Sequence, residues 1–230
     1  PWRGRKAFER EALDLLQARD VNLVLLAGFM RLLSPGFVEP WYGRLLNIHP
    51  SLLPDYPGLH VHRRVLEAGE RETGSTVHFV DQGMDTGPIV LQGRVPVLPG
   101  DTPETLERRV LFLEHRLYPR AVRLVLAGLA FPPGEGLKAL LGEAWPRFQG
   151  LPPREKPLYL RAVALLSAWG LGGLVPAALM GQGGEWGRGA FLTAHLLAEE
   201  HPVLRRELAE LPEEVRLRAE EALRRVESPL

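Results

Sequence analysis

Apolar and polar positions in the first half of the chain follow patterns that predict an α/β fold. Apolar residues recur at helical spacing over residues 8–18, and a continuous apolar run over 21–26 predicts a buried strand. Further strands are expected at 45–48, 76–80 and 89–97. We place the end of the second strand before Pro50, because proline cannot continue a central ladder.

Helices are expected around these strands. Ser34 followed by Pro35 predicts the start of a short helix, with serine as the cap and proline in the first helical position. Residues 62–68 form a second helix in this interpretation, and 103–126 a long one capped by Asp101 or Thr102. Right-handed crossovers would lay that long helix over one face of the sheet.

The composition changes after about residue 131, where proline and glycine cluster and the strand patterns stop. Residues 162–180 carry no charge, but the glycines and Pro176 within them predict two buried helical pieces instead of a membrane span. Residues 202–226 have the pattern of an amphipathic helix or helical hairpin. We therefore predict two domains, 1–150 and a helical extension of unknown role at 151–230.

Charge and cysteine content narrow the classes of function. Lys and Arg number 28 and so do Asp and Glu, so bulk charge gives no support for a nucleic-acid partner. The absence of cysteine excludes a disulfide framework, a thiolate nucleophile and a zinc–thiolate centre. No signal pattern is visible at Pro1, so a cytoplasmic location is expected.

Candidate chemistry gathers at the end of the second strand. Asn47 and His49 are two residues apart, so their side chains leave the same face. An amide can donate to an oxyanion, an imidazole can exchange a proton near neutral pH, and a carboxylate such as Asp85 can stabilise the imidazolium. Structural roles would also explain these residues, because a histidine at a strand end can be a hydrogen-bonded core residue and an aspartate can form a turn. Asn47 is one of only two asparagines, with Asn22.

If Asp85 lies beside His49, its charge should raise the pKa of the histidine. Stability from that pair would be present below the unfolded-state pKa and lost as pH rises through the folded-state pKa.

Several blocks, in order and spacing, resemble phosphoribosylglycinamide formyltransferase, the folate-dependent enzyme of purine synthesis, between about residues 5 and 130. The blocks are Ala27-Gly28-Phe29-Met30-Arg31-Leu32-Leu33-Ser34-Pro35, Asn47-Ile48-His49-Pro50-Ser51-Leu52-Leu53-Pro54, Tyr56-Pro57-Gly58-Leu59-His60, Gly74-Ser75-Thr76-Val77-His78-Phe79-Val80 and Asp85-Thr86-Gly87-Pro88-Ile89. Methionyl-tRNA formyltransferase and formyltetrahydrofolate deformylase share the Asn, His and Asp. The context at 56–60 favours the glycinamide enzyme.

The resemblance implies a formyltransferase-type open, mostly parallel sheet with flanking helices. It also implies formyl transfer from 10-formyltetrahydrofolate to the amine of glycinamide ribonucleotide, without a metal. Asn47 would hydrogen-bond the formyl oxygen, His49 would donate a proton to it, and Asp85 would tune the histidine.

Other positions carry over from the family one at a time. The folate pocket would be lined by Arg5, Met30, Arg31, Leu32, Leu33, Asp81, Gln82, Gly83 and Met84, and the substrate ribose would meet Glu114. Leu32 and Leu33 could equally be core residues, and Arg5 and Glu114 solvated charges on helices.

The chain also departs from the family. The first strand and Gly-rich turn that hold the substrate phosphate have no counterpart, so we expect about a quarter to a third of a domain of about 200 residues to be absent. The exposed sheet edge would then be apolar and prone to association, as a homo-oligomer or with a complementing N-terminal half. A non-catalytic folate-binding remnant or interaction protein is the alternative.

Overall fold

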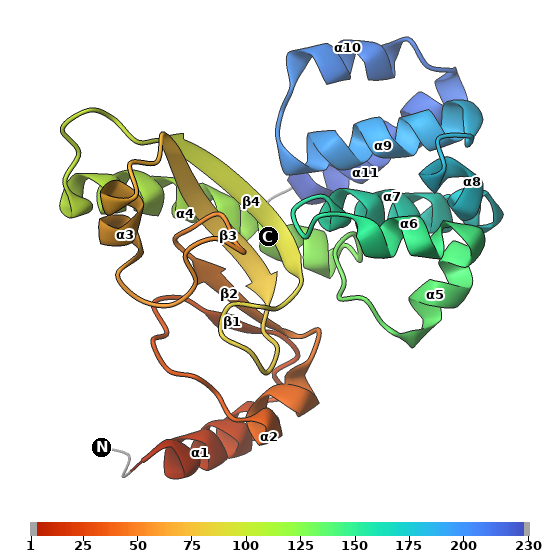
Figure 1. The fold of residues 1–230 in the computed structure, drawn as a ribbon. Coiled ribbons are helices and arrows are strands. Elements are labelled where there is room, and N and C mark those ends of the chain that lie inside the picture. Colours follow the sequence, from red (N-terminus) through yellow and green to blue (C-terminus); the bar gives the residue numbers. More distant parts are fainter. Residues whose placement is uncertain (1–3, 228–230) are drawn as a thin grey trace. The chain divides into compact units, whose positions relative to one another are not determined.

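The computed structural model describes residues 4–227, which divide into two compact units between Leu117 and Tyr118. The first unit contains a four-stranded sheet and the second contains only helices (Figure 1). The predicted functional division after residue 150 stays a prediction. The helices between 135 and 150 lie in the second unit.

The sheet of the first unit has the order β1-β2-β3-β4. Its strands are β1 (Val24–Leu26), β2 (Leu45–His49), β3 (Glu72–Phe79) and β4 (Ile89–Pro96). β1 and β2 are parallel, whereas β2 with β3 and β3 with β4 are antiparallel. The α/β class is confirmed, but the prediction of a mostly parallel sheet is wrong. Only a loop joins β3 to β4, so these two strands reverse direction. β3 also runs against β2, although a helix at 61–67 lies between them in the chain.

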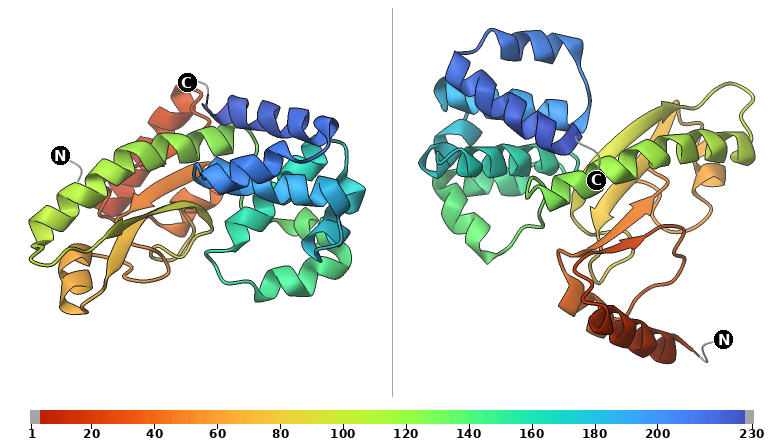
Figure 2. Two further views of the ribbon diagram at one scale, coloured as in Figure 1. Left: turned by 90° about the horizontal axis from the view of Figure 1, so that it is seen from above. Right: turned by 180° about the vertical axis from the view of Figure 1, so that it is seen from behind.

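Helices surround this sheet largely as predicted. They are α1 (Arg5–Ala18), α2 (Pro35–Val38), the 3₁₀ turn η1 (Glu39–Trp41), α3 (Val61–Glu67) and α4 (Pro103–Leu126). α4 has the predicted bounds, and Thr102 Oγ1 accepts the Thr105 N–H at its start. Seen from behind, α4 lies across one face of the sheet (Figure 2).

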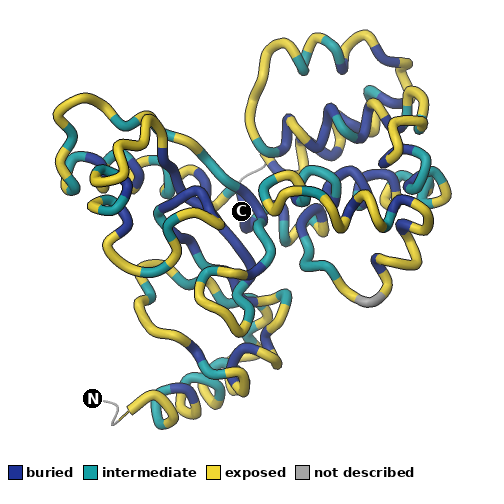
Figure 3. The backbone as a smooth tube through the Cα atoms, in the orientation of Figure 1, coloured by how far each residue is buried: buried dark blue, intermediate teal, exposed yellow. Residues whose placement is uncertain are grey.

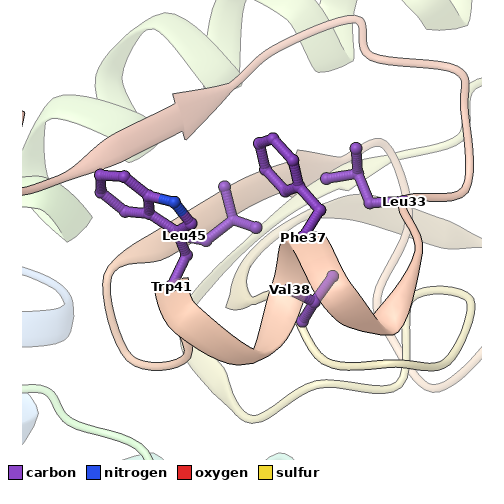
Figure 4. Close-up of a cluster of buried hydrophobic side chains, with 5 residues drawn as sticks. All are labelled: Leu33, Phe37, Val38, Trp41 and Leu45. Atoms are coloured by element: carbon purple, nitrogen blue, oxygen red, sulfur yellow. The ribbon is translucent and has the colours of Figure 1, made fainter. Parts of the chain in front are cut away.

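The core beside β1 and β2 is built from α2, η1 and the strand that follows them. Leu33, Phe37, Val38, Trp41 and Leu45 form one buried cluster (Figure 4). Ser34 is the N-cap residue of α2, as predicted, but its hydroxyl donates to the buried carboxylate of Glu9 in α1. This contact connects α1 to the start of α2.

In the described residues, the second unit is built from helices alone, several of which pack on α9. They are α5 (Glu135–Leu141), η2 (Gly142–Ala144), α6 (Trp145–Gly150), α7 (Lys156–Ala168), η3 (Gly172–Leu174), α8 (Val175–Leu179), α9 (Gly184–Ala198), α10 (Pro202–Ala209) and α11 (Glu213–Glu227). α7 and α11 both pack on α9. A Cβ at Gly189 would lie 2.2 Å from Val215 Cγ1, so α9 and α11 approach closely only because this residue is glycine.

The uncharged stretch at 162–180 spans the end of α7, a turn and α8, which confirms the prediction of two helical pieces. Within residues 4–227, no helix combines the length and the apolar character that crossing a membrane requires. The predicted hairpin at 202–226 is also present, as α10 and α11. Figure 3 shows that β2, β3, α7 and α9 contain many of the buried residues.

Leu46 and Leu25 are paired on neighbouring strands, but Leu46 is fully buried and Leu25 is 47% exposed. We expect Leu46→Ala to lower the free energy of unfolding of the first unit by about 2–5 kcal/mol, because it leaves a cavity. The matched change Leu25→Ala should cost below about 1 kcal/mol. Urea titration that follows NMR amide signals of β2 measures both, and equal losses would contradict the burial pattern.

Candidate active site

β2 and β3 place the predicted site residues on one face of the sheet. Asn47 pairs with His78 across the two strands, and His49 pairs with Thr76. Opposite residues of an antiparallel pair share a face, so these four side chains lie together. His49 is buried and Asn47 is half-buried, and β2 ends at His49 just before Pro50. The predicted common face of Asn47 and His49 is confirmed.

Asp85 reaches His49 from the loop between β3 and β4. Its Oδ2 lies 3.3 Å from His49 Nδ1 and accepts the Gly58 N–H at 2.9 Å. Asp85 has a φ of 56°, a left-handed conformation that aspartate tolerates better than most residues. The structure therefore brings together the three predicted catalytic residues.

His78 is a member of the site that the sequence analysis did not assign. Its Nδ1 lies 2.9 Å from the Phe79 carbonyl oxygen, and because that oxygen only accepts, Nδ1 carries a hydrogen. Nε2 of the neutral ring then accepts from Asn47 Nδ2, at 3.3 Å. Nε2 also lies 3.7 Å from Asp85 Oδ1. His78 thus contacts two of the three predicted residues and orients the Asn47 amide. The sequence could have indicated His78, because residues two apart on a strand share a face and His78 follows Thr76 at that spacing.

Burial controls the protonation of His49. Removal from water lowers the pKa of this histidine, and the neighbouring His78 and Arg64 side chains act in the same direction. The Tyr56 carbonyl, 2.9 Å from Nε2, and the Asp85 carboxylate raise the pKa but do not outweigh burial. The predicted rise of the His49 pKa is wrong, because the desolvation of a buried imidazolium costs more than its two acceptors return.

Asp85 behaves in the opposite way. Burial raises the pKa of this carboxyl group, but the neighbouring His78, the hydrogen bond from the Gly58 N–H and the nearby His49 together bring it below its ordinary value. Asp85 is therefore ionised at neutral pH and can stabilise positive charge that develops on His49.

A buried hydroxyl holds the loop that follows His49. Thr76 Oγ1 donates to the Ser51 carbonyl at 2.6 Å and accepts the Leu53 N–H at 3.0 Å. Gln92 donates to the same hydroxyl and to the Leu53 carbonyl, each at 2.8 Å. These contacts fix the loop that carries Tyr56, whose carbonyl accepts from His49.

The residues predicted to line a folate pocket occupy two neighbouring loops. Met30, Arg31 and Leu32 are exposed between β1 and α2, and Met84 is exposed in the loop after β3. Val80, at the start of that second loop, packs against the cluster that contains Leu33. Leu33 itself is buried in this core, so its predicted contact with a folate stays a prediction.

Polar contacts hold the second loop in shape. Asp81 accepts from the Gly83 N–H at 3.0 Å and from the Thr86 hydroxyl at 2.7 Å, and Gln82 donates to Glu39 at 2.8 Å. The loop is therefore preorganised beside the segment that contains Met30 and Leu32.

Arg5 and Glu114 lie in different surroundings. The Arg5 side chain is 55% exposed on α1 and lies 3.9 Å from Glu9. Glu114, on α4, is half-buried and accepts from the Ser75 hydroxyl at 2.9 Å. Burial raises the pKa of Glu114. In the part of the chain that the structure describes, no three His, Asp or Glu side chains come together as a metal site requires.

Comparison with known proteins identifies relatives of the first unit. Residues 1–122 match the model of the formyl transferase family. Phosphoribosylglycinamide formyltransferase of Escherichia coli is 46% identical over 151 residues, covering 66% of this chain and 68% of that protein. The trifunctional purine biosynthetic protein adenosine-3 of Drosophila melanogaster is 53% identical over 127 residues, 55% of this chain and 9% of that protein.

A solved structure supports the same likeness. Glycinamide ribonucleotide transformylase 1 from Symbiobacterium toebii aligns with a TM-score of 0.56 and 50% identity, over 58% of this chain and 63% of that one. The chain thus spans less than two thirds of this structure and about two thirds of the Escherichia coli enzyme.

An NMR titration of the imidazole signals should give His49 a pKa below its ordinary value of 6.5. Because the unfolded chain then binds more protons, stability should be level above that value and fall as pH drops towards the folded-state pKa. Asp85→Asn should lower the His49 pKa further, since it removes a favourable charge. Asp14→Asn, at an exposed position of α1, is the control. A pKa above 6.5 would contradict the dominance of burial.

Proposed function

Because this chain belongs to the formyl transferase family, we propose that it transfers a formyl group from 10-formyltetrahydrofolate to the amine of glycinamide ribonucleotide. The observation that carries the proposal is that Asn47 and His49 share one face of β2 and that Asp85, from the loop between β3 and β4, places its Oδ2 3.3 Å from His49 Nδ1. Relatives named for this reaction support the choice of substrate.

In the proposed reaction, the substrate amine forms a bond to the formyl carbon, and the bond from that carbon to the folate nitrogen breaks. The amine loses a proton and the folate nitrogen gains one, so the reaction is balanced without a metal or an oxidant. Asn47 donates to the formyl oxygen, where negative charge develops. One such donor contributes on the order of 3 kcal/mol to transition-state stabilisation in comparable sites.

His49 takes up the proton that the substrate amine releases, and Asp85 stabilises the imidazolium so formed. The imidazolium then supplies the proton for the formyl oxygen, and this proton passes to the folate nitrogen when the bond from carbon to that nitrogen breaks. Burial keeps the resting imidazole neutral, with its Nε2 hydrogen donated to the Tyr56 carbonyl. His78 holds the Asn47 amide with Nδ2 towards its own ring, which leaves one amide hydrogen for the formyl oxygen.

The two exposed loops supply the proposed folate contacts. Met30 and Leu32 from the first loop and Met84 from the second provide apolar surface. Arg5, Arg31 and the polar residues 81–83 are proposed contacts for the polar parts of the cosubstrate, and Glu114 for the substrate ribose.

We further propose that the open edge of β1 pairs with a βα segment that carries a phosphate-binding turn, in the same polypeptide or in a partner. β1 is at the edge of the sheet, and an apolar groove of about 390 Å³ lies beside it. Phe8, Leu16, Val24 and Phe29 are among its lining residues. The same open edge could instead pair copies of this chain with one another, and we include this association in the proposal. We also propose a cytoplasmic location.

Formyl transfer assayed with glycinamide ribonucleotide and a 10-formylfolate tests the function. Asn47→Ala should lower kcat by about 10²–10³-fold, because it removes a donor to the developing oxyanion. Asn22→Ala is a matched control, since Asn22 is exposed and its side chain donates to the nearby Asp20 carbonyl.

His49→Ala should also abolish turnover, with His201→Ala in the second unit as its control. Full activity in both Asn47→Ala and His49→Ala would overturn the assignment. Folate binding without turnover, even when a phosphate-binding segment is added, would favour a non-catalytic folate-binding protein.

A further inference from the structure

One buried hydroxyl connects the proposed ribose contact to the candidate catalytic strand. Ser75 lies on β3 and is fully buried. Its Oγ is 2.8 Å from the carbonyl oxygen of His49 and 2.9 Å from Oε1 of Glu114. A serine hydroxyl has a single hydrogen, so it can donate fully to only one of these two acceptors at a time.

The protonation of Glu114 decides which acceptor receives that hydrogen. When Glu114 is ionised, Ser75 donates to the carboxylate, because a charged acceptor makes the stronger hydrogen bond. When Glu114 is protonated, its own O–H can donate to Ser75 Oγ, and Ser75 is then free to donate to the His49 carbonyl. The two arrangements exclude each other and differ by one proton, which passes between Glu114 and solvent.

We propose that Ser75 is a positioning residue that links the state of Glu114 to the backbone carbonyl of His49. The substrate part of this inference rests on the proposed function, in which Glu114 meets the ribose. A ribose hydroxyl that donates to Glu114 stabilises the carboxylate and so draws the Ser75 hydrogen away from His49. Binding of the ribose thereby changes the hydrogen bonding of the strand end that carries His49.

The surroundings of Glu114 bring its change of protonation closer to neutral pH. Burial raises the pKa of Glu114, so both of its states lie closer to neutral pH than for an exposed glutamate. Glu107 and His115 are the charged groups that face it from its own helix, and Ser75 contacts it from β3. His62 of α3 faces Glu107 and His49.

NMR of the whole chain with ¹³C-carbonyl histidine, ¹⁵N proline and ¹³C-carboxyl glutamate tests the link. Only His49 and His201 precede a proline, so coupling to ¹⁵N isolates two carbonyl signals and His201→Ala separates them. We expect the His49 carbonyl signal to move upfield as pH rises, with the midpoint of the Glu114 carboxyl titration. The movement reports loss of a hydrogen bond at the carbonyl.

Ser75→Ala should abolish this step while the ring of His49 still titrates, a separation that a merely structural role would not produce. Glu114→Gln should abolish it as well. This near-isosteric change at a half-buried position keeps the test valid if Ser75→Ala does not fold. The proposal would be overturned if the His49 carbonyl shift did not change at the pH of the Glu114 midpoint. It would also be overturned if the change persisted in either variant.

Glycinamide ribonucleotide separates this inference from the proposed function. Its addition should move the Glu114 midpoint and the His49 carbonyl step together to lower pH. A step that is present without ligand but unmoved by the ribonucleotide would retain the Ser75 link and overturn the assignment of Glu114 to the ribose.

Discussion

The register between β2 and β3 constrains almost every polar contact of the site. A slip of one residue would turn each side chain of β3 to the other face of the sheet. His78 would then leave Asn47, and Thr76 would leave the loop that follows His49, although its hydroxyl there satisfies two backbone groups. Because unpaired buried polar groups are costly, these contacts specify the same register that the apolar side chains of the opposite face require.

Burial then sets the electrostatics of the site. The two histidines and Asp85 are largely removed from water, so each charge depends on its neighbours. Asp85 keeps its charge because the Gly58 N–H donates to its carboxylate and two imidazoles lie beside it, whereas the acceptors around His49 do not offset its desolvation. The result is a neutral imidazole beside a carboxylate, an arrangement that can accept a proton when charge develops nearby.

The helical unit obeys different constraints. Its packing depends on small residues such as Gly189, where α9 and α11 approach, and on Arg120, which donates to the carbonyls of Leu196 and Leu197 at the end of α9. Cationic groups at a helix C-terminus interact favourably with its dipole. These two contacts help to hold the helices of this unit together.

The sequence by itself determined most helices and strands of the first unit, though not all of their bounds, and singled out Asn47, His49 and Asp85 as candidate residues. Local signals were sufficient there, because α4 depends on helical periodicity and a Thr102 cap, and Asn47 and His49 depend on strand alternation. Tertiary structure decided the mixed sheet, the entry of His78 into the site and the direction of the His49 pKa shift. Strand direction, cross-strand neighbours and desolvation arise only when segments far apart in the chain pack together, so no local pattern encodes them.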